Sequence, residues 1–206
     1  MPALRAVLFD LDGVLVDSRE AWFRLVNQAT RHFCKPDVSR EQFEQSWGQG
    51  IEADLQQFFP GCAAADVQRF YEAHLLDFDG CMLRRDGARD VLVGLHEAGI
   101  LRGVVTNTPT CLARDLLAWA GLIGLVDVTV GAGPRIAAKP APDMVLQACR
   151  ELELQPRQAL LVGDSQCDAE AAAAAAVRFV GFRTERAPAV QELGEILALV
   201  GAPPGR

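Results

Sequence analysis

Two aspartates that follow a short apolar segment are the residues of this sequence best suited to chemistry. Asp10 comes directly after residues 4–9, Asp12 follows two positions later, and Gly13 comes next. Residues 4–9 show little alternation, which predicts a strand buried on both faces of a parallel sheet. Ligands bind at the carboxyl end of such strands, and an extended backbone points residues two apart in the same direction. Taken alone, the pair is compatible with a metal site or with an ordinary turn.

Further polar side chains fall at or just beyond the ends of other predicted strands or loops. They are Thr106 with Asn107, Lys139, and Asp164 with Asp168. One parallel sheet would bring them to the same edge as the first two aspartates. A carboxylate cluster attracts Mg²⁺, which prefers oxygen ligands and offsets the repulsion between like charges. A hydroxyl and a lysine beside the cluster would supply the donor and the positive charge that a phosphoryl group needs, so the set indicates phosphate-ester chemistry.

The segments that must position these residues alternate between strand and helix patterns from residue 87 onward. Strands are predicted over 101–106, 126–130, 159–163 and 177–181, and helices over 88–98, 109–119, 142–152, 169–176 and 187–199. Strands that alternate with helices in this way are typical of an α/β fold with a parallel sheet. The first strand, at residues 4–9, would belong to the same sheet.

Residues 18–80 carry no strand pattern. Helices are predicted near 19–33, 40–47, 51–59 and 64–77. This stretch separates the first strand from the next one, which indicates an all-helical subdomain inserted into the core. We therefore assign residues 1–17 and 81–206 to an α/β catalytic core and residues 18–80 to the insertion, and we expect hinges at its borders.

Two helix starts in the insertion have side chains suited to capping. Asp17 and Ser18 precede the first helix, and either oxygen can accept from its free amides. Ser39 is followed three residues later by Gln42, which is the spacing of a capping box. Both starts support the helical interpretation of the insertion.

The composition excludes several classes of function. The 206 residues include 20 Lys and Arg against 27 Asp and Glu, a net charge of −7, and no basic run interrupts this balance, which argues against nucleic acid as a partner. No stretch of about 18 apolar residues and no signal-like start is present, so we expect a cytoplasmic protein without a membrane partner. The six cysteines have no CxxC spacing and indicate neither a zinc site nor a disulfide framework.

Four short motifs occur in a fixed order along the chain. They are DLDGVLVDS at 10–18, Thr106 in VVTNTP, Lys139 in KPAPD, and GDSQCD at 163–168. In this series the sequence resembles the haloacid dehalogenase-like hydrolase superfamily, in its phosphoglycolate phosphatase-like and β-phosphoglucomutase-like branch. The resemblance implies a Rossmann-like three-layer core with a parallel sheet, and residues 18–80 resemble the small helical cap of that branch.

The resemblance also implies the roles of the core residues. Asp10 would attack phosphorus and become an aspartyl phosphate, and Asp12 would act as general acid and base. Thr106 would donate to a phosphate oxygen with Asn107 supporting the same loop. Lys139 would neutralise both the nucleophile and the transferring group.

A magnesium site is part of the same resemblance. Asp10, the main-chain carbonyl of Asp12, and Asp164 would bind Mg²⁺. Asp168 would reach the metal through water or hold its surroundings in place. The expected protein is an Mg²⁺-dependent phosphatase, a phosphoric monoester hydrolase acting on a small phosphorylated metabolite of the phosphoglycolate or sugar-phosphate type.

Two other functions stay open at this point. The aspartyl phosphate could be returned to a sugar by a phosphomutase of the β-phosphoglucomutase type, or the chain could be a non-catalytic binding protein that kept the fold. Either a monomer or a homodimer is compatible with the sequence.

The cap offers three candidates for substrate contact. Gln49 and Gly50 belong to a glycine-rich run between two predicted helices, and Arg24 could offer a charge to an acidic substrate. Five cap aromatics could also line the substrate pocket, although most of them are expected in the core of the cap: Trp22, Phe23, Trp47, Phe58 and Phe59.

Overall fold

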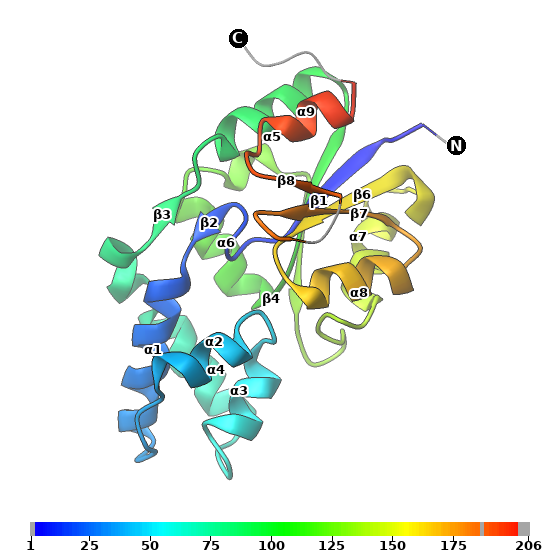
Figure 1. Cartoon of the computed structure of the whole chain (residues 1–206). Coiled ribbons are helices and arrows are strands. Elements are labelled where there is room, and N and C mark those ends of the chain that lie inside the picture. The colour runs from blue at the N-terminus through cyan, green and yellow to red at the C-terminus, as the bar shows by residue number, and fades with distance from the viewer. Residues whose placement is uncertain (1–2, 186–187, 202–206) are drawn as a thin grey trace.

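The computed structural model describes residues 3–185 and 188–201. Its centre is a six-stranded sheet in the order β5-β4-β1-β6-β7-β8, in which every neighbouring pair is parallel. Figure 1 shows helices on both sides of this sheet and a separate group of helices at one end. The predicted α/β fold with a parallel sheet and a helical region is confirmed. The strands are β1 (Ala6–Phe9), β4 (Leu101–Pro109), β5 (Val128–Ala132), β6 (Ala159–Gly163), β7 (Arg178–Phe182) and β8 (Ala189–Val190).

The first strand is fully buried, and its side chains point alternately into two apolar cores. Val7 and Phe9 belong to the core that includes residues of α5 (Ala88–Glu97), α6 (Thr110–Trp119) and α9 (Glu195–Leu199). Ala6 and Leu8 belong to the core formed with α7 (Asp143–Glu151) and α8 (Gln166–Ala174). Because successive residues of a strand face opposite sides, one strand serves both cores. The sheet is therefore the middle of three layers.

The helical group is joined to the core by a pair of short strands. The chain enters through β2 (Val16–Asp17) and leaves through β3 (Leu83–Arg84), which pair antiparallel. Two residues are too few to give a strand pattern, so neither strand was predicted. The predicted capping box is confirmed, since Ser39 Oγ accepts from the Gln42 amide and the Gln42 side chain accepts from the Ser39 amide. The group comprises α1 (Arg19–His32), α2 (Arg40–Ser46), α3 (Ile51–Gln57), α4 (Ala64–His74) and the 3-10 helix η1 (Leu75–Cys81).

The predicted helix over 187–199 is wrong for the residues that the structure describes. Residue 187 lies outside those residues, β8 extends the sheet beside β7, and only Glu195–Leu199 is helical. The Gly181 amide donates to the Pro188 carbonyl at 2.8 Å, which recruits this segment to the sheet edge. The apolar spacing of the segment fits either structure, so the pattern could not separate a short strand and turn from one helix.

Strand β4 is longer than predicted. It continues past residue 106 to Pro109, and its register with β5 shifts between Thr106 and Pro109. This extension carries the polar residues of the VVTNTP motif along the carboxyl edge of the sheet.

Two further 3-10 helices complete the chain, η2 (Ile123–Leu125) and η3 (Pro156–Gln158). Over residues 3–185 and 188–201, no helix combines the length and the apolar character needed to cross a membrane.

Candidate active site

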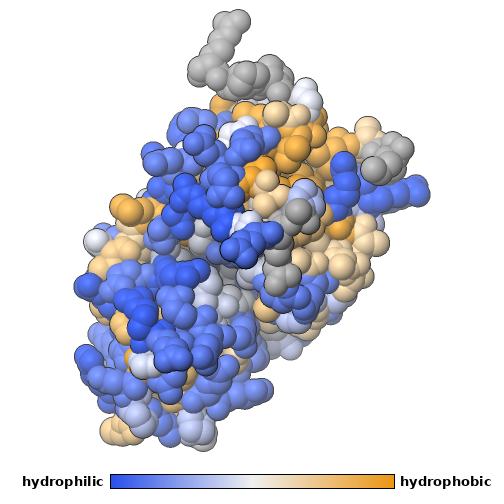
Figure 2. Space-filling view, viewed as in Figure 1, coloured by the Kyte–Doolittle hydropathy of each residue, from blue (hydrophilic) through white to orange (hydrophobic). Residues whose placement is uncertain are grey.

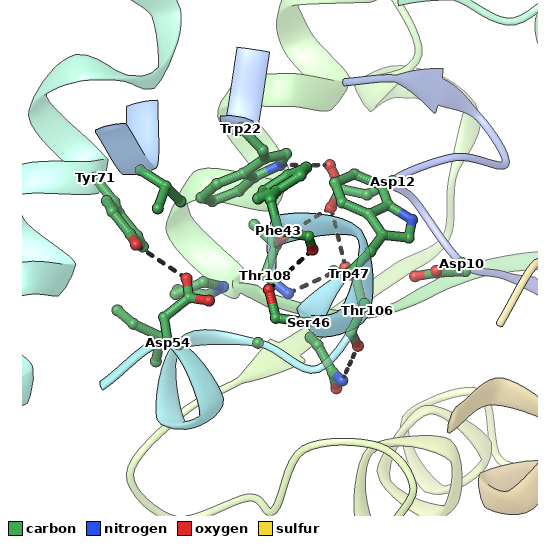
Figure 3. Close-up of a pocket in the computed structure, with 16 residues that line it drawn as sticks. Asp10, Asp12, Trp22, Phe43, Ser46, Trp47, Asp54, Tyr71, Thr106 and Thr108 are labelled. Atoms are coloured by element: carbon green, nitrogen blue, oxygen red, sulfur yellow. Dashed lines mark hydrogen bonds between the residues drawn. The ribbon is translucent and has the colours of Figure 1, made fainter. Parts of the chain in front are cut away.

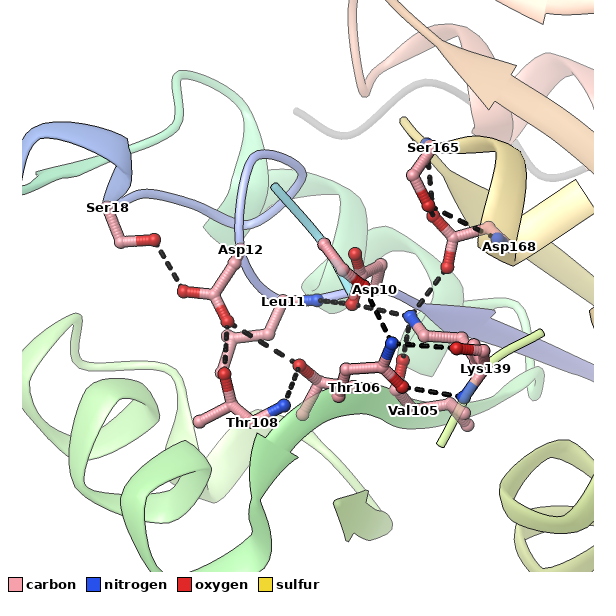
Figure 4. A network of polar contacts seen from close by, with 12 residues as sticks. Asp10, Leu11, Asp12, Ser18, Val105, Thr106, Thr108, Lys139, Ser165 and Asp168 are labelled. Atoms are coloured by element: carbon pink, nitrogen blue, oxygen red, sulfur yellow. Dashed lines mark hydrogen bonds and ion pairs between the residues drawn. The ribbon is translucent and has the colours of Figure 1, made fainter. Parts of the chain in front are cut away.

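The carboxyl end of the central strands collects polar residues from separate segments of the chain. Asp10 follows β1, Thr106 lies in β4, and Asp164 follows β6. Lys139 comes from the loop between β5 and α7, and Asp168 from the first turn of α8. Figure 4 shows Asp10, Thr106, Lys139 and Asp168 gathered at this edge. Parallel strands that end at the same edge account for the arrangement.

Lys139 is the buried cation of the site. Its Nζ lies 2.8 Å from Asp10 Oδ1 and 2.5 Å from Asp168 Oδ1, and it donates to the Val105 carbonyl at 2.9 Å. Burial alone would lower the pKa of Lys139, but the two carboxylates outweigh burial and raise the pKa above its usual range. The ammonium therefore stays charged, and each of its three N–H groups has a partner.

Three carboxylates converge beside this lysine. One oxygen from each of Asp10, Asp164 and Asp168 lies within 4.8 Å of the others. Burial raises the pKa of Asp10 well above its ordinary value, with Lys139 opposing this and the other two aspartates adding to it. Burial and then Asp168 raise the pKa of Asp164 to about 6. A cluster of buried oxygen donors that repel one another fits a hard divalent cation such as Mg²⁺.

Gly13 lets the first motif approach the fourth, and Gly163 leaves room for Asp168 within the fourth motif. Gly13 has φ +90°, and a Cβ on it would lie 2.1 Å from Asp164 Oδ2. A Cβ on Gly163 would lie 2.4 Å from Asp168 Cβ. Side chains at these positions would displace two members of the carboxylate cluster.

Asp12 lies outside the carboxylate cluster and is held by hydroxyl and indole donors. Its Oδ1 accepts from Ser18 Oγ at 2.5 Å and from Trp22 Nε1 at 2.8 Å. Its Oδ2 accepts from Thr108 Oγ1 at 2.7 Å and from Thr106 Oγ1 at 3.5 Å. Figure 4 shows the carboxylate turned towards Ser18 and Thr108. The side chain of Asp12 is therefore separate from the three-carboxylate cluster.

Sequence reasoning missed most of these partners of Asp12. Ser18 was expected to cap α1, but that helix has no side-chain cap, and the Ser18 hydroxyl is used on Asp12 instead. Trp22 was among the cap aromatics that could line the pocket, and it does line the pocket described below, but its hydrogen bond to Asp12 was not expected. Thr108 had an available signal, because it lies two residues after Thr106 on an extended strand and so projects to the same side.

A pocket opens over Asp10 and Asp12, between the sheet edge and the cap helices (Figure 3). Its core wall includes Thr106 and Asn107, and its cap wall is mostly apolar and aromatic. The remaining lining residues are Trp22, Val26, Phe43, Ser46, Trp47, Gly48, Gly50, Ile51, Asp54, Tyr71, Thr108 and Pro109. The nucleophile candidate therefore lies at the base of a cavity whose shape depends on the cap.

Asn107 joins the cap loop to the core. Its Nδ2 donates to the Gly48 carbonyl at 2.6 Å and to the Lys139 carbonyl at 3.0 Å, and its Oδ1 accepts from the Lys139 amide at 2.7 Å. Gly50 also comes close, since a Cβ on it would lie 3.2 Å from Asn107 Cβ. Asn107 thus orients the backbone of Lys139 as well as lining the pocket.

Two of the three cap candidates lie away from the pocket. The Gln49 side chain donates to the Gln45 carbonyl at 2.7 Å and is not among the lining residues. Arg24 is exposed, pairs with Glu20 at 2.7 Å, and lines a different hollow on the outer side of the cap. Only Gly50 of the three contributes to the pocket wall.

The fold and the site define a hydrolase of one family. The chain matches the haloacid dehalogenase-like hydrolase family over residues 7–182 and belongs to it. It is 30% identical over 184 residues to a phosphoglycolate phosphatase of Nitrosospira multiformis, covering 84% of this chain and 80% of that one. The protein is accordingly an enzyme of the phosphatase group in this family.

Solved structures agree on the fold. A subfamily IA hydrolase of the same superfamily from Geobacter sulfurreducens has 27% identity and a TM-score of 0.75, with 96% of this chain and 100% of that chain covered. The CbbY protein of Rhodobacter sphaeroides, solved in complex with phosphate, has 24% identity and a TM-score of 0.82, with 94% and 96% covered. At 24% identity, the similarity to CbbY shows a shared fold and nothing further.

Proposed function

We propose that this protein is an Mg²⁺-dependent phosphatase that hydrolyses a small phosphorylated metabolite, of the phosphoglycolate or sugar-phosphate type, through an aspartyl phosphate. One observation carries the proposal. Asp10 is paired with the buried Lys139 at 2.8 Å, in the same pocket as the separately held carboxylate of Asp12. A nucleophile beside a fixed positive charge and a second, differently placed carboxylate is the minimum for two-step phosphoryl transfer.

In the first step a carboxylate oxygen of Asp10 bonds to phosphorus as the bond to the leaving oxygen breaks. Asp12 gives a proton to that oxygen, so the leaving group departs as an alcohol. In the second step Asp12 takes a proton from water as the water oxygen attacks phosphorus, and the bond to Asp10 breaks to release phosphate. Lys139 and the Thr106 hydroxyl offset the charge on the phosphoryl oxygens.

The residues that would hold Mg²⁺ are Asp10, Asp164 and the main-chain carbonyl of Asp12, with Asp168 beside them. The cation would neutralise charge on the phosphoryl group. In the structure Asp168 also accepts from Ser165 Oγ at 2.5 Å and pairs with Lys139. Asp168 is therefore suited to holding Lys139 and the α8 turn in position.

The helical insertion is proposed to act as a cap over this site. We assign residues 18–80 to the cap and residues 1–17 and 81–206 to the core, with the β2–β3 pair at the crossing. The proposal keeps a small phosphorylated metabolite as the partner, a monomer or homodimer as the assembly, and the cytoplasm as the location.

The direct test is release of phosphate from an aryl phosphomonoester, p-nitrophenyl phosphate. Asp10→Asn should lower kcat by about 10³-fold or more without loss of the fold, and excess chelator should abolish wild-type activity until Mg²⁺ is restored. Asp115→Asn, the same change at an exposed position on α6, is the matched control. Undiminished turnover by Asp10→Asn would refute the proposal. Isomerisation of β-glucose 1-phosphate without phosphate release would identify a mutase instead. If the protein turns over neither p-nitrophenyl phosphate nor β-glucose 1-phosphate, the result would favour a binding protein.

A further inference from the structure

The end of the pocket farthest from the nucleophile carries a carboxyl group that the phosphatase mechanism does not use. Figure 3 shows Asp54 and Tyr71 at one end of the pocket and Asp10 at the other. Asp54 lies on α3 and Tyr71 on α4, and Tyr71 donates its hydroxyl proton to Asp54 Oδ2 at 2.9 Å. The tyrosine ring is buried and meets Trp22 edge-on, with ring centres 5.5 Å apart. The pair is thus held in place at the pocket wall.

The hydrogen bond between Tyr71 and Asp54 determines what this pair can offer to a ligand. Tyr71 uses its only proton on Asp54, so both oxygens of an ionised Asp54 and the phenol oxygen of Tyr71 have only lone pairs to present. A ligand hydroxyl or amino group can donate to these acceptors. A ligand carboxylate cannot, because it has no proton to give.

The described residues that line the pocket include no cationic side chain that could pair with a second anion. Among the described residues that line it, three are aspartates and none is lysine, arginine or histidine. Lys139 contacts Asp10 but spends its donors on Asp10, Asp168 and Val105. A carboxylate at the far end would lose its hydration without gaining a cation, which is costly.

Arg19, which contacts the pocket residue Trp47, already has a carboxylate partner. Arg19 lies over the ring of Trp47, 4.8 Å from its centre, and pairs with Glu44 at 2.7 Å. Arg19 is not among the described residues that line the pocket, although its positive charge acts on Asp164. Its guanidinium is engaged by Glu44 and by the ring of Trp47.

We propose that Asp54 and Tyr71 make this pocket selective for phosphomonoesters whose leaving group ends in a hydroxyl or amino group, and against those that end in a second anion. This rests on the proposed phosphatase function and narrows it from phosphoglycolate-type or sugar-phosphate-type substrates to the hydroxylated kind. The aromatic wall formed by Trp22, Phe43 and Trp47 suits the apolar faces of a carbon chain or sugar ring between the two polar ends. Selection then works by repulsion as well as attraction.

The acidity of the pair sets the conditions for a test. Burial raises the pKa of Asp54 to about 7, opposed by the Tyr71 hydrogen bond and assisted by Glu52. Burial and Asp54 raise the pKa of Tyr71 well above its ordinary value, so the phenol keeps its proton. At pH 8 the carboxylate form of Asp54 predominates, and assays belong there.

The experiment compares alcohols and acids of the same length as substrates of the wild-type protein with Mg²⁺. The pairs are 2-hydroxyethyl phosphate with phosphoglycolate, glycerol 3-phosphate with 3-phosphoglycerate, and sorbitol 6-phosphate with 6-phosphogluconate. Members of a pair differ at the far end only, so the ratio of their kcat/KM values isolates that end. We expect the alcohol to be favoured by about tenfold or more in the pair whose length reaches Asp54. Phosphoethanolamine tests the amino group against the hydroxyl of the two-carbon alcohol.

Asp54→Asn removes the charge but keeps the shape, and it should bring that ratio to within about threefold of one. Glu52→Gln makes the same change in charge two residues away on the same helix, where the side chain is exposed, and should keep the wild-type ratio. The kcat/KM ratios of the wild-type protein test the proposal even if a variant fails to fold.

Three outcomes would overturn the inference. They are an acid cleaved as well as its alcohol in every pair, an unchanged ratio in Asp54→Asn, or no cleavage of any pair by an enzyme that cleaves p-nitrophenyl phosphate. Failure of the phosphatase proposal would be detected separately, by the turnover of p-nitrophenyl phosphate in the wild-type protein and in Asp10→Asn.

Discussion

At the core end of the pocket the polar side chains are fixed by ion pairs and charge-assisted hydrogen bonds. At the cap end a single carboxyl group, that of Asp54, is paired with the Tyr71 hydroxyl among aromatic rings. Lys139 bonds to two carboxylates and a carbonyl, and Asp12 accepts from three side chains within 2.8 Å. The carboxylate of Asp54 has a single hydrogen-bond partner among the described residues, Tyr71. Reaction geometry needs such rigid support, while recognition needs shape and a few aimed polar groups.

Trp22 connects the two ends. Its indole N–H donates to Asp12 at 2.8 Å, and its ring meets the edge of Tyr71. The residue that orients the general acid–base candidate therefore also packs against the residue that orients Asp54. The comparison between the two ends is testable by removing one support at a time.

Removing the charge at the core end should have the largest effect. Lys139→Met leaves Asp10 and Asp168 buried without their cation, so the free energy of unfolding should fall by about 3–5 kcal/mol and turnover of p-nitrophenyl phosphate should be lost. Urea unfolding measures the first effect. Lys35→Met is the control. Among the described residues the Lys35 ammonium donates to the Pro60 carbonyl and pairs with no carboxylate, so this substitution should cost less than about 1 kcal/mol. Equal losses in both variants would contradict a special role of the core pair.

Removing the charge of Asp54 at the cap end should raise the free energy of unfolding, by an amount that depends on pH. The pKa of Asp54 is raised from 3.8 to about 7, so folding favours its protonated form. Between about pH 4 and about pH 7 the folded state binds one more proton than the unfolded state, so the free energy of unfolding falls as the pH rises. The penalty for ionising Asp54 in the folded state is absent below about pH 4 and complete above about pH 7. Asp54→Asn should therefore be more stable than wild type by about 2 kcal/mol at pH 8 and by much less at pH 4. The difference at pH 8 is smaller than the whole pKa shift implies, because solvent in the pocket partly screens the charge of Asp54.

Thermal or urea unfolding of the two proteins at both pH values checks this. All other titrating groups are shared, so the difference between the proteins isolates Asp54. A stability difference that does not change with pH would show that Asp54 titrates normally.

Removing one hydroxyl from the support of Asp12 should have the smallest effect. Ser18→Ala loses the 2.5 Å bond to Asp12, and kcat should fall by about three- to tenfold, equivalent to about 1 kcal/mol. Ser39→Ala loses a helix cap in the same insertion, and it should lower stability by about 1 kcal/mol while leaving kcat unchanged. If Ser18→Ala changes stability only, its hydroxyl does not position the general acid–base candidate.

The core end was the more predictable one because its residues are placed by the sheet. Asp10, Thr106 and Asp164 each lie at or just after the end of a strand that had a clear apolar pattern, and parallel strands bring such ends together. The motif series then predicted a separate role for each of these residues. Local patterns also predicted the capping box at Ser39, which depends on residues three apart.

The cap end could not be predicted in the same way. Asp54 and Tyr71 are 17 residues apart on different helices, and helical periodicity does not say which faces of two helices meet. Arg24 was chosen for its charge, but Glu20 lies one turn away and pairs with it on the exposed surface. Strands of two residues, such as β2 and β8, carry too little pattern to detect.

The paired strands β2 and β3 have a consequence for substrate choice. Val16 lies opposite Arg84 and Asp17 opposite Leu83, so the insertion begins and ends at neighbouring points of the backbone. Exchanging everything between these points leaves the register of the large sheet and the spacing of its catalytic loops unchanged. Under the proposed function, substrate choice can therefore change through one continuous stretch of the chain while the residues of the carboxylate cluster keep their places.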